Sequence, residues 1–200
     1  MNKRIEWIDI AKAVAIVLVG IGHYSCPKIL MAFIYSFHMP LFFILSGITF
    51  NTSKYTFQQF FIRKLKTLVF PWCLAVVLYT VFQNTCLVLG MSGIQIPWIN
   101  IIPRIFWHYR VGAYDPVYWF IPCLFVTELL LYWILKLCKN RTHIFVLMLV
   151  WLGAATAYYY GVGKVLVWEI DLIPLTAFYI CIGILVKEWI INFIENSANL

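Results

Sequence analysis

The chain has 200 residues, of which 64% are hydrophobic and only 12% are charged, and its mean hydropathy is +0.88. Soluble domains average about 45–50% apolar and about 25% charged residues, so this composition excludes a water-soluble globular protein. Fifteen lysines and arginines against eight acidic residues give a net charge of +7, which we assign to membrane topology, with no nucleic-acid partner expected.

Six apolar stretches are long enough to form membrane-spanning helices, which need about 20 residues each. They lie at about residues 8–25, 29–50, 67–90, 116–136, 143–161 and 165–186. The sequence therefore predicts an all-α, polytopic transmembrane helical bundle of about six spans, forming a single domain over residues 1–200.

Basic residues gather on one side of this bundle when the amino terminus is placed in the cytoplasm. Eleven lysines and arginines then lie inside and four lie outside. Cytoplasmic loops are enriched in Lys and Arg, so we predict a cytoplasmic amino terminus. The connection at about residues 91–115 is then external, and its many Pro, Trp and Tyr residues indicate a segment lying in the membrane interface.

The first predicted helix carries three ionisable residues, Asp9, Lys12 and His23. At 100° per residue they share one face, with Lys12 and His23 about 16 Å apart along the axis. An ionisable side chain costs roughly 3 kcal/mol at the membrane centre, so we expect this face to line a polar passage. The structural alternatives are snorkelling of Lys12 and contact of His23 with lipid headgroups.

The second predicted helix contains the run FHMPLFFILSG at residues 37–47. Pro40 has no N–H, so the carbonyl four residues earlier loses its helical partner and the helix is expected to kink beside His38. His38 is a candidate for orienting a substrate or stabilising an oxyanion, and hydrogen bonding to a backbone carbonyl is its structural alternative. Ser46 and Gly47 are expected to form a close helix contact.

A basic cluster opens the third predicted helix, where Arg63, Lys64 and Lys66 precede Pro71 and Trp72. Such a cluster is usual at the cytoplasmic end of a span. It also suits a cytosolic ligand that carries phosphate, because Arg binds phosphate in a bidentate manner and Lys supplies a point charge.

Three acidic residues in the second half of the chain differ in their expected surroundings. Glu128 lies well inside the fourth apolar stretch, needs a proton or a charged partner, and is a functional candidate. Glu169 and Asp171 lie at the outer edge of the sixth stretch, where we expect them to be solvated. The six cysteines are scattered without zinc-binding spacing, so we expect no metal site.

Four segments carry a resemblance to a known family. In RIEWIDIAKAVAIVLVGIGH at residues 4–23, Asp9 is followed by the basic residue Lys12, and ten residues separate Lys12 from His23. The other segments are FHMPLFFILSG, RKLKTLVFPW and VYWFIPCLF, at residues 37–47, 63–72 and 117–125. Together they are similar to the integral-membrane acyltransferase family 3, particularly its branch related to fucose 4-O-acetylases and other glycan O-acetyltransferases.

The resemblance implies transfer of an acyl group, commonly acetyl, from cytosolic acyl-CoA to a hydroxyl group of a carbohydrate or lipid-linked glycan at the membrane. Acyl-CoA is then a co-substrate, no bound cofactor is expected, and the expected location is the bilayer of a bacterial cytoplasmic membrane. His23 resembles the family's catalytic histidine, and Lys12 its basic partner, where many members have Arg. The cytoplasmic basic pair corresponds to Arg63 and Lys66.

These residues support a mechanism in which His23 acts as general base on the acceptor hydroxyl. His38 is expected to assist, and Glu128 is a candidate carboxylate partner for His23. The residues predicted to bind the phosphates of acyl-CoA are Lys12, Arg63 and Lys66. Asp9, about 21 Å from His23 along the helix, is a motif residue. The structural residues of the second motif are Pro40, Ser46 and Gly47.

Other interpretations fit the same residues. Buried His, Lys and Glu side chains are also typical of a transporter or flippase, here for a lipid-linked sugar. Family members are usually longer, so we expect the domain to be incomplete on its C-terminal side, and an inactive truncated remnant is a further alternative. Within the enzyme hypothesis, both direct transfer and transfer through an acyl-histidine are compatible with the sequence.

Overall fold

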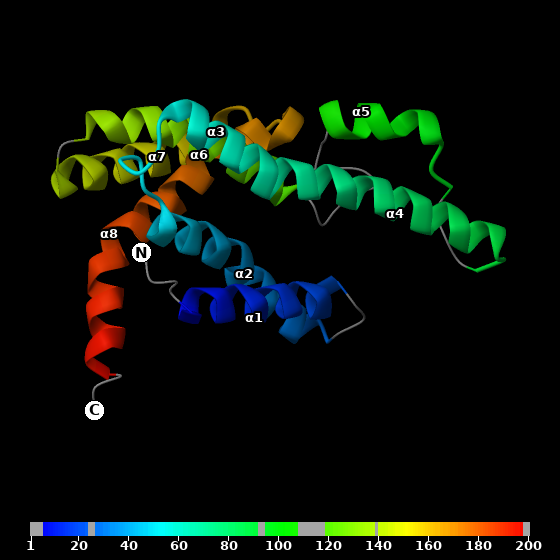
Figure 1. Ribbon diagram of the computed structural model, residues 1–200, viewed down its shortest axis with the longest axis horizontal. Helices are drawn as coiled ribbons and strands as arrows, with labels where there is room; N and C mark the ends of the chain where they lie inside the picture. The colour runs from blue at the N-terminus through cyan, green and yellow to red at the C-terminus, as the bar shows by residue number, and fades with distance from the viewer. Residues whose placement is uncertain (1–5, 24–26, 92–94, 108–118, 139, 198–200) are drawn as a thin grey trace. The chain divides into compact units, whose positions relative to one another are not determined.

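The computed structural model describes residues 6–23, 27–91, 95–107, 119–138 and 140–197. Every regular element in these ranges is a helix, so the all-α prediction is confirmed. In chain order the elements are α1 (Glu6–His23), α2 (Lys28–Thr49), α3 (Phe57–Lys64), the π-helical turn η1 (Leu65–Val69), α4 (Phe70–Val88), η2 (Trp98–Asn100), α5 (Ile101–Phe106), α6 (Phe120–Leu137), α7 (Arg141–Gly161), η3 (Val167–Leu172) and α8 (Ile173–Ser197) (Figure 1).

Five helical segments in the described part of the chain are long and apolar enough to cross a membrane. They are Lys28–Thr49, Phe57–Val88, Phe120–Leu137, Arg141–Gly161 and Val167–Phe193. These match five of the six predicted spans. The stretch predicted at 8–25 forms α1, whose 18 residues include Glu6, Asp9 and Lys12. Because each charge is costly in hydrocarbon, these three charges set α1 apart from the five segments.

Some predictions fall on residues outside the described ranges. These are the start of the first motif at residues 4–5, the start of the fourth at 117–118, and much of the connection at 91–115. Within 95–107 that connection forms η2 and α5, with Trp98 and Trp107 exposed and Ile96 buried. Its location in the membrane interface stays a prediction, as does the cytoplasmic amino terminus.

Contacts divide the chain into two compact units, which are described separately. Unit 1 consists of Met1–Asn51, Cys138–Leu152 and Leu175–Leu200, and unit 2 consists of Thr52–Leu137 and Gly153–Pro174.

In unit 1, helices α1 and α2 lie side by side (Figure 1). The buried residues of α1 are Ile8, Ala15 and Gly22, which recur every seven residues and therefore share one face. Ile8 packs with Leu45 and Ile48 of α2 in a buried apolar cluster. This face sets how α1 is rotated against α2, and so where the polar residues of α1 point.

Helices α2 and α8 of unit 1 approach each other closely through two glycines. A Cβ atom added at Gly47 would overlap the carbonyl oxygen of Ile180, and one added at Gly183 would overlap the carbonyl oxygen of Ile44. Small residues let two helix backbones come together in this way. The close helix contact expected at Gly47 is therefore present, and its partner is Gly183.

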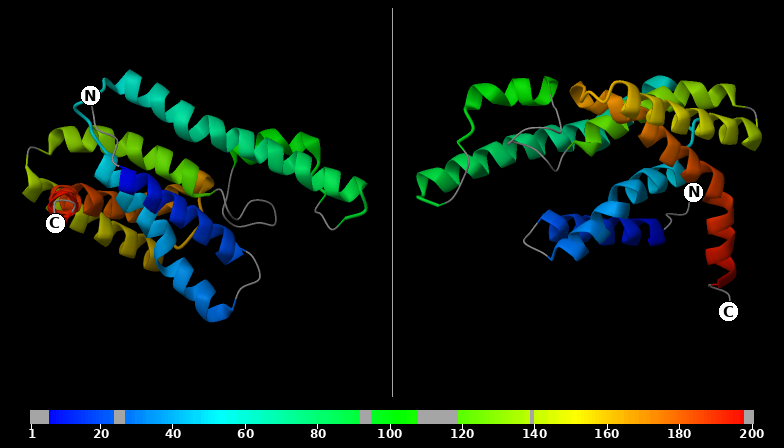
Figure 2. Two further views of the ribbon diagram at one scale, coloured as in Figure 1. Left: turned by 60° about the horizontal axis from the view of Figure 1, so that its bottom comes forward. Right: turned by 180° about the vertical axis from the view of Figure 1, so that it is seen from behind.

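In unit 2, α3, η1 and α4 follow one another in a single long rod (Figure 2). Thr56 caps α3 in a reciprocal capping box with Gln59. The rod widens into a π turn at Leu65–Val69, where the N–H of Phe70 bonds to the carbonyl of Leu65. Pro71 follows directly and cannot donate to the preceding turn. Helix α6 packs against the first part of this rod.

The expectation that Glu169 and Asp171 are solvated is wrong, because their side chains are 0% and 8% exposed. The reason is the turn that carries them. Trp168 and Glu169 adopt positive φ angles of 54° and 55°, which folds the chain back on itself. Asp171 Oδ1 then accepts a hydrogen bond from the N–H of Leu166 at 2.9 Å, and Trp168 Nε1 donates to the carbonyl of Ile105 at 3.0 Å.

Substituting either glycine of the α2–α8 contact is expected to destabilise the protein. Gly47→Ala and Gly183→Ala each force a methyl group into a backbone carbonyl, which costs about 1–3 kcal/mol of the free energy of unfolding. Gly153→Ala on α7 is the matched control, because nothing lies within 4 Å of its added Cβ. Thermal unfolding in detergent measures the difference, and equal melting temperatures for all three variants would contradict the contact.

Candidate functional site

Four of the six residues predicted to act in catalysis or donor binding fall into two groups, one in each unit. The first group, in unit 1, is the imidazole cluster formed by His23, Tyr35 and His38. The ring centroid of Tyr35 lies 5.8 Å from that of His23 and 5.3 Å from that of His38. His23 is the exposed last residue of α1, whereas His38 lies within α2 and is 5% exposed. The structure thus brings both predicted histidines to one tyrosine.

The hydrogen bond of His38 fixes the form of its ring. His38 Nδ1 lies 2.7 Å from the carbonyl oxygen of Ile34. A carbonyl oxygen only accepts, so Nδ1 carries the proton and, in the neutral ring, Nε2 presents a lone pair. A bond to a backbone carbonyl was the structural alternative for His38. The carbonyl bound by His38 is that of Ile34, one turn earlier in α2. It is a different carbonyl from that of Ser36, which Pro40 leaves without a helical donor.

Tyr35 also contacts the end of α1 directly. Its hydroxyl donates to the carbonyl of Gly22 at 2.9 Å. A Cβ atom added at Gly22 would lie 2.9 Å from Cε1 of Tyr35 and 3.3 Å from Cγ2 of Ile34, so only glycine fits here without displacing a neighbour. Sequence reasoning missed Tyr35. The sequence pattern that could have identified Tyr35 is its position three residues before His38, which places both side chains on one side of α2.

Asp9 and Lys12 of α1 lie beside its packed face. Within unit 1 Asp9 is exposed and Lys12 is half-buried. Both are on the side of the helix next to the face formed by Ile8, Ala15 and Gly22. The polar passage expected between Lys12 and His23 stays a prediction.

The second group lies in unit 2, around an open depression on α3 and η1. We call it the basic depression, and its seven lining residues are Lys54, Tyr55, Gln59, Ile62, Arg63, Lys66 and Thr67. Three of the seven are cationic and none is acidic. The depression therefore brings together the predicted phosphate-binding pair, Arg63 and Lys66, and adds Lys54, which sequence reasoning did not single out.

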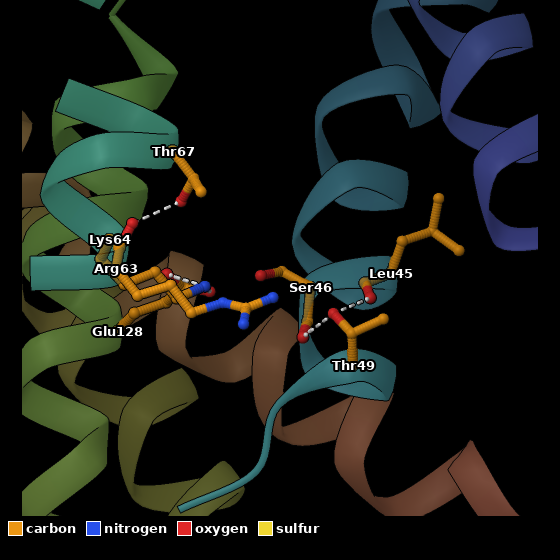
Figure 3. Close-up of polar contacts among 7 residues, drawn as sticks. All are labelled: Leu45, Ser46, Thr49, Arg63, Lys64, Thr67 and Glu128. Carbon is orange, nitrogen blue, oxygen red and sulfur yellow. Dashed lines mark hydrogen bonds and ion pairs between the residues drawn. The ribbon is translucent and has the colours of Figure 1, made fainter. Parts of the chain in front are cut away.

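Tyr55 organises the cations of the basic depression. Arg63 Nη1 donates to the Tyr55 hydroxyl at 2.7 Å, and the guanidinium carbon lies 5.2 Å from the centroid of the tyrosine ring. Lys54 Nζ lies 5.4 Å from the same centroid. Thr67 donates to the carbonyl of Arg63, one turn earlier (Figure 3). Arg63 thus reaches the depression with its side chain held against an aromatic ring.

Lys64, the neighbour of Arg63, pairs with Glu128 of α6 (Figure 3). Its Nζ atom lies 2.7 Å from each carboxylate oxygen. The Glu128 side chain is 0% exposed and that of Lys64 is 22% exposed. The sequence required a proton or a partner for Glu128, and the structure supplies Lys64. The further role of Glu128 as a partner of His23 stays a prediction.

Breaking this buried ion pair from one side is expected to be costly. Lys64→Met leaves the Glu128 carboxylate buried without its cation, which lowers the free energy of unfolding by about 3–5 kcal/mol. Adding Glu128→Leu removes the stranded charge, so the double variant is expected to recover most of the loss. Thermal unfolding in detergent measures both changes.

The control for this prediction is the ion pair between Arg141 and Glu188, whose side chains are 60% and 73% exposed. Glu188→Gln is expected to change the free energy of unfolding by about 0–1 kcal/mol, because solvent already screens this pair. If Lys64→Met lowers the free energy of unfolding no more than Glu188→Gln does, then the pair of Lys64 with Glu128 does not stabilise unit 2.

The sequence matches a protein-family model described as an acyltransferase domain, that of acyltransferase family 3, over residues 5–198. No curated protein and no solved structure matches the chain. The family match covers nearly all of the sequence, including both groups of site residues, and it agrees with the apolar helices described above. The chain therefore belongs to the membrane acyltransferase family 3.

Proposed function

We propose that this integral membrane protein is an O-acyltransferase that moves an acyl group, most simply acetyl, from cytosolic acyl-CoA to a hydroxyl group of a cell-envelope carbohydrate. Family membership supports acyl transfer. The observation that carries the proposal is the imidazole cluster, in which two histidines from different helices lie against one tyrosine. Imidazole changes its protonation near neutral pH, as a general base for hydroxyl activation requires.

In the proposed reaction His23 removes the proton of the acceptor hydroxyl while that oxygen attacks the carbonyl carbon of the thioester. A carbon–oxygen bond forms and a tetrahedral intermediate results. The intermediate collapses by breaking the carbon–sulfur bond. The CoA thiolate leaves and receives the proton held by His23, so the enzyme returns to its starting form.

His38 has a more limited role in this proposal. Its Nδ1–H is committed to the Ile34 carbonyl, so the neutral ring offers only a lone pair at Nε2. A lone pair accepts a hydrogen bond from a sugar hydroxyl, but it does not stabilise an oxyanion. Of the two roles predicted for His38, orienting the acceptor therefore fits better.

We assign the phosphate groups of acyl-CoA to the basic depression. Arg63 uses one of its N–H groups on Tyr55, which leaves others for a phosphate. Lys66 and Lys54 add point charges from the same lining, and no carboxylate there opposes an anion. Lys12 stays a further candidate for the donor. The ion pair of Glu128 with Lys64 favours a role for Glu128 in holding α6 to the rod.

The carbohydrate acceptor and the bacterial cytoplasmic membrane are part of the proposal on the strength of the sequence motifs. The opening motif and FHMPLFFILSG are the segments most similar to the glycan O-acetyltransferase branch. A cytosolic donor and an acceptor carried at the membrane both suit a protein whose helices can span the bilayer.

Removal of the His23 imidazole tests the proposed function. Membranes containing the protein receive labelled acetyl-CoA, and label is measured in the carbohydrate fraction. His23→Ala is expected to lower transfer at least about a hundredfold, because a positioned general base contributes roughly that much. His143→Ala, at the exposed start of α7, controls for loss of an imidazole elsewhere. Unchanged transfer by His23→Ala would exclude His23 from the mechanism.

Neutralising the basic depression tests donor binding. Arg63→Ala and Lys66→Ala are each expected to raise the KM for acetyl-CoA about tenfold or more while kcat changes little, because a charged hydrogen bond to phosphate contributes about 1.5–3 kcal/mol. Lys136→Ala is the control, since Lys136 lies over the ring of Tyr132 and is not one of the lining residues. Steady-state kinetics at several acetyl-CoA concentrations give both constants, and equal KM values for all three variants would refute the assignment.

A further inference from the structure

We propose that Tyr35 is the positioning residue of the imidazole cluster: its hydroxyl binds the backbone of α1 next to His23 and thereby holds the ring of His23 against α2, near His38. Its effect on catalysis rests on the proposed function. Its effect on the position of His23 does not, and the two are measured separately below.

The first step concerns the hydrogen bond between α2 and α1. The Gly22 carbonyl, directly before His23 in α1, accepts the hydrogen bond of the Tyr35 hydroxyl at 2.9 Å. A side chain of α2 is therefore bonded to the backbone of α1. The bond fixes the peptide unit that joins Gly22 to His23.

The second step concerns the tyrosine ring. Its centroid distances of 5.8 Å to His23 and 5.3 Å to His38 are within the range of direct aromatic contact. The planes are inclined by 52° and 37° respectively. A ring of this size against both imidazoles restricts how far either one can rotate.

The third step concerns the anchor of His38. The carbonyl that receives its Nδ1–H belongs to Ile34, the residue next to Tyr35 in the chain. Both Ile34 and Tyr35 also lie against Gly22, within 3.3 Å of where its Cβ would be. Two consecutive residues of α2 therefore fix His38 on one side and the residue before His23 on the other, which ties the two imidazoles to one short piece of backbone.

The experiment compares Tyr35→Phe, which keeps the ring and removes the hydroxyl, with the wild-type protein. The first readout is the rate at which diethyl pyrocarbonate modifies His23, followed by mass spectrometry of the full-length protein's peptides. We expect Tyr35→Phe to raise this rate about fivefold, because a hydrogen bond of about 1 kcal/mol no longer holds the backbone next to His23. This readout needs no substrate.

Tyr158→Phe is the matched control. Its hydroxyl also donates to a backbone carbonyl, that of Lys164, at 2.9 Å beyond the end of α7. The same substitution there removes the same kind of bond and is expected to leave the modification of His23 unchanged.

A second pair of variants tests the ring contact. Gly22→Ala displaces the Tyr35 ring and is expected to raise the rate at which His23 is modified. The methyl group of Gly20→Ala meets nothing within 4 Å, so this variant is expected to leave that rate unchanged.

The second readout is acetyl transfer, in which Tyr35→Phe is expected to lower kcat about fivefold and to leave the KM for acetyl-CoA unchanged. If the modification rate rises but even the wild-type protein transfers no acetyl group, then the positioning role stands and the proposed function fails. If His23 is modified equally fast in the wild-type, Tyr35→Phe and Gly22→Ala proteins, then the positioning role is overturned, whatever the activity.

Discussion

Polar side chains in an apolar helix bundle must find their partners inside the protein, because lipid offers none. This constraint determines the arrangement of both candidate sites. Glu128 is fully buried and pairs with Lys64, which holds α6 to the helix that carries the basic depression. In the other unit, the Tyr35 hydroxyl bonds to the carbonyl of Gly22, and the His38 imidazole bonds to a carbonyl one turn earlier. The first two of these bonds fix a residue beside one that is proposed to act, and the third fixes His38 itself.

In the proposed function the two units meet different requirements of acyl transfer. Unit 1 holds titratable rings in fixed positions, with one neutral form of His38 selected by its backbone partner. Unit 2 gathers cations around a surface that contains no opposing carboxylate. A thioester donor with several phosphates needs both a proton acceptor and a phosphate site, and we assign these proposed tasks to the first two helices and to the start of the third.

Helix positions were predictable because apolar length alone defines them, and the close contact at Gly47 followed from the small residue itself. Partners were not predictable in the same way. Nothing in the sequence pattern links Lys64 to Glu128, and the place of Tyr35 depends on how α1 is rotated against α2. Burial of Glu169 was missed for another reason. A position at the end of a span indicates solvation, but the left-handed backbone at this residue turns it inward.

The π turn at Leu65–Val69 has a consequence for how the rod divides its surfaces. A π turn accommodates one residue more than an α turn, so everything before it is rotated by about 100° relative to an uninterrupted helix. The basic depression at its amino-terminal end and the exposed apolar side chains of α4 are thereby set at angles about the axis that an uninterrupted helix would not give. One continuous rod thus carries a polar surface and an apolar surface, and the inserted residue offsets the first against the second.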